Sequence, residues 1–183
     1  MKFSSGSGLL AICLSIDAAA ATACKLSKTS SSVAPVPTCG FNVFTNGDFS
    51  DGTTGWGASV DGALTASTDC AELNSATCGQ MYGQDSNAYF NIAQHITTIP
   101  GKTYSGSMVY DIQVSGNDNG SLECYIKETG SQYYLTAWVL NNLSINTRST
   151  MDLQFTATAS SYIFVCSEVG GVHVLVTGFT LSC

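Results

Sequence analysis

Residues 121–140 read SLECYIKETGSQYYLTAWVL, and the prediction of the fold starts from the alternation of their apolar and polar side chains. Such alternation over a short run is typical of a strand with one buried and one exposed face. The segments 121–127 and 132–140 both alternate, and turn residues around Thr129 and Gly130 separate them. We therefore expect an antiparallel hairpin. Its inward residues are expected to be Leu122, Cys124, Ile126, Tyr133, Leu135, Ala137 and Val139.

The opposite face of this hairpin is predicted to be aromatic. With the turn centred on Thr129 and Gly130, Tyr125 lies opposite Tyr134, and directly opposed side chains are about 5 Å apart on one face. Trp138 follows on the same face of the second strand. We expect Tyr125, Tyr134 and Trp138 to form an aromatic row on the side of the sheet away from the core.

Strand patterns recur about every 8–12 residues along the chain, and helix patterns are scarce. Many short strands with glycine-rich turns predict an all-β sandwich or barrel. The residues between the second and third of these strands, 61–87, are expected to form a loop. The expected strands are 41–45, 56–60, 88–98, 103–114, 121–127, 132–140, 149–157, 161–167 and 172–181.

Polar side chains are expected to border the aromatic row. The segments 104–113 and 151–155 also alternate, which directs Asp111, Gln113 and Gln154 outward, as Glu123 is in the hairpin. Aromatic rings beside carboxylates and amides are typical of a sugar-binding platform, because apolar sugar faces stack on rings and sugar hydroxyls need polar partners. The candidate binding residues are Tyr125, Tyr134, Trp138, Asp111, Gln113, Glu123 and Gln154.

The N-terminal segment has the pattern of a secretory signal peptide. Lys2 precedes a short apolar run from Leu9 to Ile16, and small residues end the segment. The run is shorter than the roughly 20 apolar residues that span a bilayer. We expect a signal peptide over 1–23, a Ser/Thr/Pro linker over 24–38 and one domain over 39–183. The protein is then secreted, to the extracellular space or a cell wall.

Cysteine usage fits an oxidising compartment, in which cysteines pair. Cys13 belongs to the signal peptide, so seven of the eight cysteines remain, and we leave Cys24 unpaired or joining two chains as a dimer. The other six allow fifteen pairings. We favour the simplest set, in which the pairs are Cys39 with Cys183, Cys70 with Cys78, and Cys124 with Cys166. The sequence has no Cys-x-x-Cys and its two histidines are isolated, so we expect no metal site of this kind.

The charge limits the partners. The formal net charge is −7, which disfavours nucleic acids and anionic membranes. Only 10% of the residues are charged, so the surface is expected to interact through hydroxyl and amide hydrogen bonds. Asn119 and Asn142 begin acceptor sequences for N-linked glycans, and both fall in predicted loops.

The sequence does not favour an enzyme. It has no Gly-x-Ser-x-Gly nucleophile elbow. His95 and His173 lie in strand-like segments and are expected to be structural. Asp111 and Glu123 could flank a glycosidic bond in principle, but a domain this small with no catalytic partner domain does not favour hydrolysis.

The segment 41–56, FNVFTNGDFSDGTTGW, resembles the N-terminal signature of family 4/9-type carbohydrate-binding modules. In that signature a strand leads into Asn-Gly-x-Phe-Glu, a glycine-rich turn and Gly-Trp. The segment 93–112 resembles the family motif Gln-x-Ile-x-x-x-Pro-Gly-x-x-Tyr-x-x-Ser. Residues 153–166 and 174–183 resemble its last strands, and secreted fungal proteins of this type often carry such cysteines. The matching residues of the two motifs are Asn46, Gly47, Phe49, Gly55, Trp56, Gln94, Ile96, Pro100, Gly101, Tyr104 and Ser107.

The resemblance implies a jelly-roll β-sandwich of two antiparallel sheets, tied here by disulfides, with Phe49 and Trp56 packed in the core. It also implies glycan binding on one face or at a loop edge. The first functional hypothesis is therefore a secreted, non-catalytic carbohydrate-binding module for a polysaccharide or cell-wall glycan. The alternative is a structural or adhesive cell-wall protein, or a secreted interaction protein, without a glycan site.

The resemblance also raises the question of calcium. Relatives hold a structural calcium ion through acidic residues, and this chain has Ser50 and Thr177-Gly178 at those positions. Calcium takes six to eight oxygen ligands that include carboxylates. Asp48 or Asp51 could substitute, but the site is doubtful and we expect no cofactor.

Overall fold

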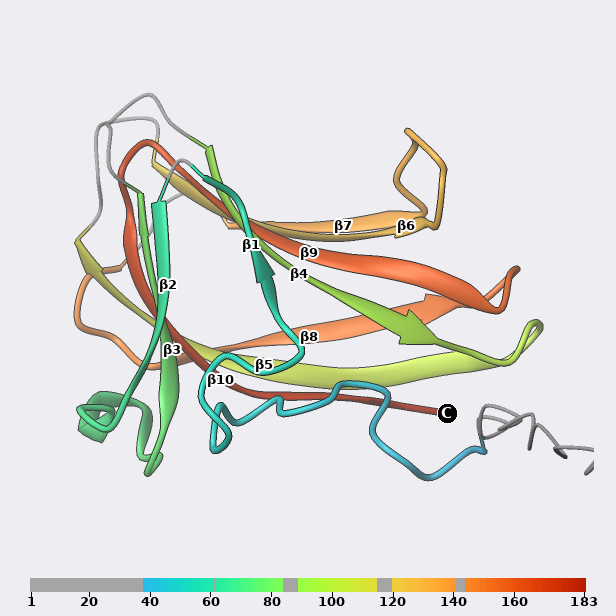
Figure 1. The fold of residues 1–183 in the computed structure, drawn as a ribbon, viewed down its shortest axis with the longest axis horizontal. Coiled ribbons are helices and arrows are strands. Elements are labelled where there is room, and N and C mark those ends of the chain that lie inside the picture. The colour runs from blue at the N-terminus through green and yellow to red at the C-terminus, as the bar shows by residue number, and fades with distance from the viewer. Residues whose placement is uncertain (1–37, 61, 84–88, 115–119, 141–143) are drawn as a thin grey trace, which may run out of the picture. The chain divides into compact units, whose positions relative to one another are not determined.

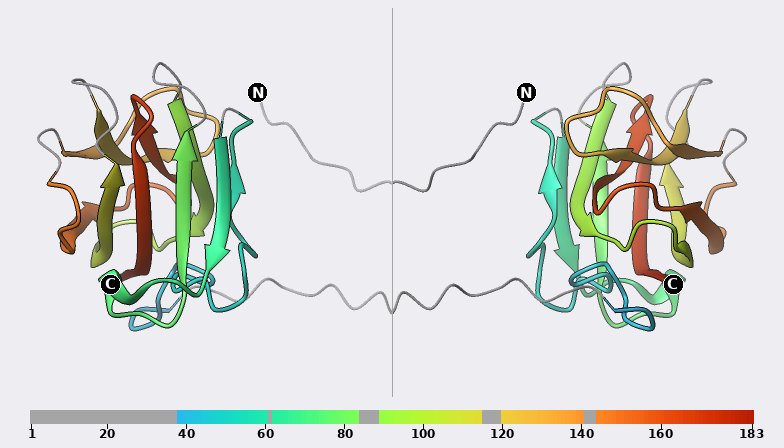
Figure 2. Two further views of the ribbon diagram at one scale, coloured as in Figure 1. Left: turned by 90° about the vertical axis from the view of Figure 1, so that its left-hand side faces the viewer. Right: turned by 90° about the vertical axis from the view of Figure 1, so that its right-hand side faces the viewer.

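The computed structural model describes residues 38–60, 62–83, 89–114, 120–140 and 144–183. Within them, two antiparallel five-stranded sheets face each other as layers (Figure 1, Figure 2). Sheet A has the strand order β1-β4-β9-β6-β7, and sheet B has the order β2-β3-β10-β5-β8. The prediction of an all-β, jelly-roll β-sandwich of two antiparallel sheets is confirmed.

Each sheet combines strands from distant parts of the chain. Sheet A consists of β1 (Gly57–Ala58), β4 (Tyr89–Thr97), β9 (Ser161–Val169), β6 (Ser121–Glu128) and β7 (Thr136–Leu140). Sheet B consists of β2 (Gly62–Ser67), β3 (Cys78–Gly83), β10 (His173–Ser182), β5 (Thr103–Val114) and β8 (Ser149–Thr156). Among the described residues the one helical turn is η1 (Ala71–Leu73), and no helix there is long and apolar enough to cross a membrane.

The region 61–87, expected to be a loop, contains the strands β2 and β3 instead. Their sequences, GALTAS and CGQMYG, are rich in small residues, so their alternation is weak. In β3 the small residues are needed at the core, because a Cβ at Gly79 would lie 2.7 Å from the Phe49 ring.

Residues 41–45 were expected to form a strand and do not. They run alongside the last residues of β10, where the Val43 amide donates to the Leu181 carbonyl at 2.9 Å. Gln94 of β4 binds the same segment from the other sheet. Its Oε1 accepts from the Thr45 amide at 2.7 Å and its Nε2 donates to the Thr45 carbonyl at 2.8 Å.

The residues of the N-terminal signature build one end of the core. Phe49 and Trp56 are 1% and 8% exposed, and their rings stack at 5.4 Å, as the resemblance implied. Trp56 Nε1 donates to the Asn46 carbonyl at 3.1 Å, and the Asn46 side chain accepts from the Asp51 amide at 2.9 Å. Asn46 has a φ of 52°, a left-handed conformation that asparagine tolerates. The signature is therefore structural.

Three cysteine pairs lie at disulfide distance, and they are the pairs favoured from the sequence. Their Cα–Cα distances are 4.8 Å for Cys39–Cys183, 5.9 Å for Cys70–Cys78 and 4.1 Å for Cys124–Cys166. The first pair joins the ends of the domain, and the last pair links the neighbouring strands β6 and β9 within sheet A.

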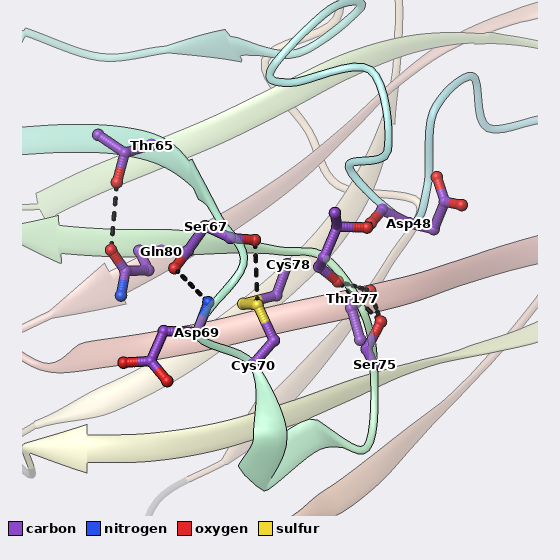
Figure 3. Close-up of a disulfide and its surroundings, with 10 residues drawn as sticks. Asp48, Thr65, Ser67, Asp69, Cys70, Ser75, Cys78, Gln80 and Thr177 are labelled. Carbon is purple, nitrogen blue, oxygen red and sulfur yellow. Dashed lines mark hydrogen bonds between the residues drawn. A yellow bond between two sulfur atoms is a disulfide. The ribbon is translucent and has the colours of Figure 1, made fainter.

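The Cys70–Cys78 pair holds η1 over the outer face of sheet B (Figure 3). Leu73 of η1 packs there against Leu175 of β10, and these residues form a small second core with the two cysteines. Hydroxyl groups fix the end of this segment, because Thr177 Oγ1 and Ser75 Oγ donate to the Thr77 carbonyl at 3.1 and 2.8 Å.

Some predictions fall outside the described residues. These are the signal peptide over 1–23, the linker up to residue 37 with Cys24, and the glycan acceptors Asn119 and Asn142.

Candidate functional site

The hairpin of β6 and β7 has a different register from the expected one. Tyr125 lies opposite Ala137 rather than Tyr134, and Cys124 lies opposite Trp138. The register is thus shifted by three residues (137 − 134), and an odd shift turns every side chain of one strand to the other face. The prediction for Trp138 was therefore wrong, because its ring points inward and packs against the core.

The shift has a local cause. Residues 129–135 form a wider loop than expected, and β7 begins only at Thr136. The Ser131 amide donates to the Glu128 carbonyl at 2.9 Å, and the Leu135 amide donates to the Ile126 carbonyl at 2.7 Å. Residues of the loop and of β7 that were predicted to point inward are consequently exposed, with 85% exposure for Tyr133 and 47% for Val139.

Tyr125 and Tyr134 nevertheless meet on the outer face of sheet A. Tyr125 points outward because its neighbours Cys124 and Ile126 are fully buried in the core. The loop brings the Tyr134 ring within 4.3 Å of the Tyr125 ring, measured between centroids, at an interplanar angle of 42°. Tyr134 remains 61% exposed, so the pair presents an aromatic surface to solvent.

Polar residues lie beside the tyrosine pair on the same face. In the cross-strand register, Glu123 of β6 lies beside Ser167 of β9, which lies beside Asn91 of β4. The Ser167 hydroxyl donates to Asn91 Oδ1. Burial raises the pKa of the Tyr125 phenol, and the hydroxyl of Ser167 beside it opposes that rise. Carboxylate, amide and hydroxyl groups therefore converge next to the rings.

Asn91 and Ser167 were not among the residues selected from the sequence. The alternation of Phe90, Ile92, Gln94 and Ile96 as buried residues could have placed Asn91 on the outer face. Alternation alone does not show that β4, β9 and β6 follow one another in the same sheet. The sequence therefore did not reveal that Asn91, Ser167 and Glu123 lie together.

Asp111, Gln113 and Gln154 do not lie near the tyrosine pair, so their predicted place beside the aromatic row was wrong. They belong to β5 and β8, which are strands of sheet B, whereas Tyr125 belongs to sheet A. Consecutive strands β5 and β6 lie in different sheets, and the prediction treated them as neighbours. Gln154 Nε2 donates to Ser105 Oγ at 3.1 Å on the outer face of sheet B.

Asp111 is also inaccessible. It is 1% exposed and lies beside Leu175, the residue of sheet B on which η1 packs. Burial raises the pKa of its carboxyl, and the charge of Glu72 adds to that rise. Of the seven candidates, the structure brings together Glu123, Tyr125 and Tyr134.

The residues around Asp48 do not fit a calcium ion. A cavity of about 410 Å³ lies there, and Asp48 is the one carboxylate among the residues that line it. Asp48 Oδ1 already accepts from the amide and the hydroxyl of Ser50 at 3.1 and 2.8 Å. Thr177, at the position of the expected acid, donates to the Thr77 carbonyl instead. In the described part of the chain no group of three or more His, Cys, Asp or Glu residues is placed to hold a metal.

No family model matches this sequence, and a search of curated proteins finds no match. Solved structures do match. A family 61 carbohydrate-binding module, solved with β-1,4-galactotriose, aligns at a TM-score of 0.59 and 12% identity over 77% of this chain and 97% of its own. The xylan-binding family 22 module of Xyn10C from Paenibacillus barcinonensis aligns at 0.59 and 15% identity over 80% and 97%.

A family 4 module aligns at a TM-score of 0.55 and 13% identity, over 73% of this chain and 98% of the module. The enzymatically active domain of a bacteriophage tailspike protein also matches, over 21% of its length. Identities this low show a shared fold. That fold is the one the family resemblance implied.

Proposed function

We propose that this protein is a secreted, non-catalytic carbohydrate-binding module whose binding site is the outer face of sheet A. The observation that carries the proposal is the pair of tyrosine rings, Tyr125 and Tyr134, whose centroids lie 4.3 Å apart and of which Tyr134 is 61% exposed. Exposed ring pairs of this kind offer a large apolar area with polar edges, which suits the C–H faces and hydroxyls of a sugar. The fold shared with carbohydrate-binding modules supports the same function.

The polar groups beside the rings define what the ligand must offer. Glu123 accepts hydrogen bonds, whereas Asn91 and Ser167 both donate and accept them. A neutral sugar with free hydroxyls satisfies this set. The net charge of −7 disfavours acidic polysaccharides, so the proposed ligand is an uncharged polysaccharide of a plant or microbial cell wall.

The positions of the candidate carboxylates support a protein that binds a glycan without cleaving it. Asp111 and Glu123 were the carboxylates that could have flanked a glycosidic bond. They lie on the outer faces of different sheets, and Asp111 is 1% exposed, so they cannot act on one bond together. Three cysteine pairs at disulfide distance support an oxidising, extracellular compartment.

Affinity electrophoresis in gels containing xylan or β-1,4-galactan tests the proposal. The wild-type protein should be retarded by at least one polymer, and Tyr134→Ala should lose most of that retardation because its stacking surface is gone. Tyr82→Ala is the matched control, since Tyr82 is 51% exposed on the outer face of sheet B. Equal retardation of wild type and Tyr134→Ala, or loss in Tyr82→Ala alone, would contradict the proposed face.

A second candidate function is protein binding without a glycan site. Tyr133, Leu135 and Val139 are exposed beside the tyrosine pair, and together they form an apolar surface that suits a protein contact. Sedimentation velocity with and without reductant separates the two functions. A dimer that survives Tyr134→Ala and is lost in Val139→Ser would favour the protein contact.

A further inference from the structure

A second cavity lies at the opposite edge of the same outer face. It has a volume of about 230 Å³, and the N-terminal segment and the end of β4 line it, with Phe41, Val43, Thr45, His95 and Thr97 among the residues. His95 and Thr97 alternate with the buried Gln94 and Ile96, so they point to the outer side of sheet A.

This cavity contains groups that the fold does not use. Phe41 is 71% exposed although it is a large apolar residue. Within the described part of the chain, the His95 ring and the Thr97 hydroxyl make no hydrogen bond. Asn42, by contrast, is used structurally, since its amide donates to the Phe179 carbonyl at 2.8 Å. An exposed ring beside an imidazole and a hydroxyl is a sugar-binding combination. The sequence predicted a structural role for His95, which lies exposed in β4.

The cavity and the tyrosine pair are connected by residues of three neighbouring strands of sheet A. In the cross-strand register, His95 of β4 lies beside Ile163 of β9, which lies beside Lys127 of β6. The next row is Ala93, Val165 and Tyr125. Two strand spacings of about 4.8 Å separate β4 from β6, so roughly 10 Å lies between the backbones of His95 and Lys127. Small and aliphatic side chains occupy the middle, and aromatic residues stand at both ends.

We propose that the cavity formed by Phe41, His95 and Thr97 is a second sugar subsite for the same polysaccharide chain. The inference rests on the proposed function of the tyrosine pair. The chain then lies across β4, β9 and β6, with one sugar on Tyr125 and Tyr134 and another on Phe41. The ligand class is therefore an internal stretch of a linear, neutral polysaccharide rather than a single terminal sugar.

The test is a calorimetric titration with oligosaccharides of increasing length, from disaccharide to hexaose, of xylan or β-1,4-galactan, whichever polymer retards the protein. The wild-type affinity should rise with length until both subsites are filled. Phe41→Ala should lower the affinity for the longest oligosaccharides about tenfold and leave the shortest unchanged. Tyr134→Ala should weaken binding at every length.

The matched control is Tyr82→Ala. Tyr82 is 51% exposed on the outer face of sheet B, so it lies on the opposite side of the sandwich from both subsites. Its removal should leave every affinity unchanged. If Phe41→Ala binds all lengths like wild type while Tyr134→Ala does not, the second subsite is wrong and the proposed function stands. If no oligosaccharide or polymer binds the wild type, the proposed function itself fails.

Discussion

The outer faces of the two sheets differ in how much of each is covered by other parts of the chain. On sheet B, the segment between β2 and β3 covers the part of the outer face around Leu175, and the Cys70–Cys78 pair keeps Leu73 packed against this residue. On sheet A, Tyr134 and Phe41 stay exposed at two edges of the face. A covered face adds a second core and stability, whereas an open face can bind a ligand. This comparison supports the proposal that the ligand binds on the outer face of sheet A, whereas the covered part of sheet B has a structural role.

Trp138→Ala gives the largest expected effect, and it separates inward from outward rings of sheet A. Trp138 packs against the core, so the free energy of unfolding should fall by about 3 kcal/mol. Urea denaturation measures this loss, and Trp138→Phe should recover most of it. A Trp138→Ala protein of wild-type stability that no longer binds polysaccharide would place the ring on the outer face instead.

Glu168 lies between the two sheets. Its protonation is therefore expected to change the stability of the fold and not the outer face of either sheet. It is fully buried, its Oε2 accepts from the Val172 amide at 2.8 Å, and burial raises its pKa from 4.5 to about 7. Below pH 4.5 the carboxyl is neutral in both the folded and unfolded states, and stability is greatest. As the pH rises to about 7 the unfolded state loses its proton first, so stability falls by about 3 kcal/mol.

Chemical denaturation across pH 4 to about 8 measures this dependence, and Glu168→Gln should flatten it. The raised pKa of Asp111 acts in the same direction, so a smaller slope should remain. A wild-type protein that gains stability over this range would contradict the burial of Glu168.

Removal of the Cys70–Cys78 pair tests how much the packing of η1 on the outer face of sheet B contributes to stability. The double variant Cys70→Ser, Cys78→Ser should lose about 2–3 kcal/mol of unfolding free energy, because the closed loop is short and the small core opens. Affinity for the polysaccharide should not change. A parallel loss of affinity in the folded double variant would show that the two faces are not independent.

The alternation of β4, β5, β6, β8 and β9 was sufficient to predict an all-β sandwich or barrel, because large apolar side chains repeat with period two, and the family resemblance implied the two-sheet sandwich. The site was predicted only in part. Alternation does not tell which sheet a strand joins, so Asp111 and Glu123 were wrongly placed together. Hydrogen bonds of Ser131 and Leu135 set the width of the hairpin loop, and composition does not reveal them, so Trp138 was turned outward.

Thr77→Val gives the smallest expected effect. It tests how the segment between β2 and β3, which covers part of sheet B, is attached to the rest of the domain. Thr77 Oγ1 donates to the Asp48 carbonyl at 2.8 Å, and loss of this bond should cost about 1 kcal/mol. Differential scanning calorimetry measures the change. The same instrument should record an unchanged Tm after EDTA treatment, and a Tm lowered by EDTA would show that a metal holds this loop.

The assignment of binding to the open face of sheet A is tested most directly by NMR. An oligosaccharide of the polymer that retards the protein is titrated into ¹⁵N-labelled protein, and backbone amide shifts are followed. The account predicts changes over 91–97, 123–127, 134–137 and 163–167, with little change in β3 and β10. Changes centred on β3, β10 and η1 would contradict it.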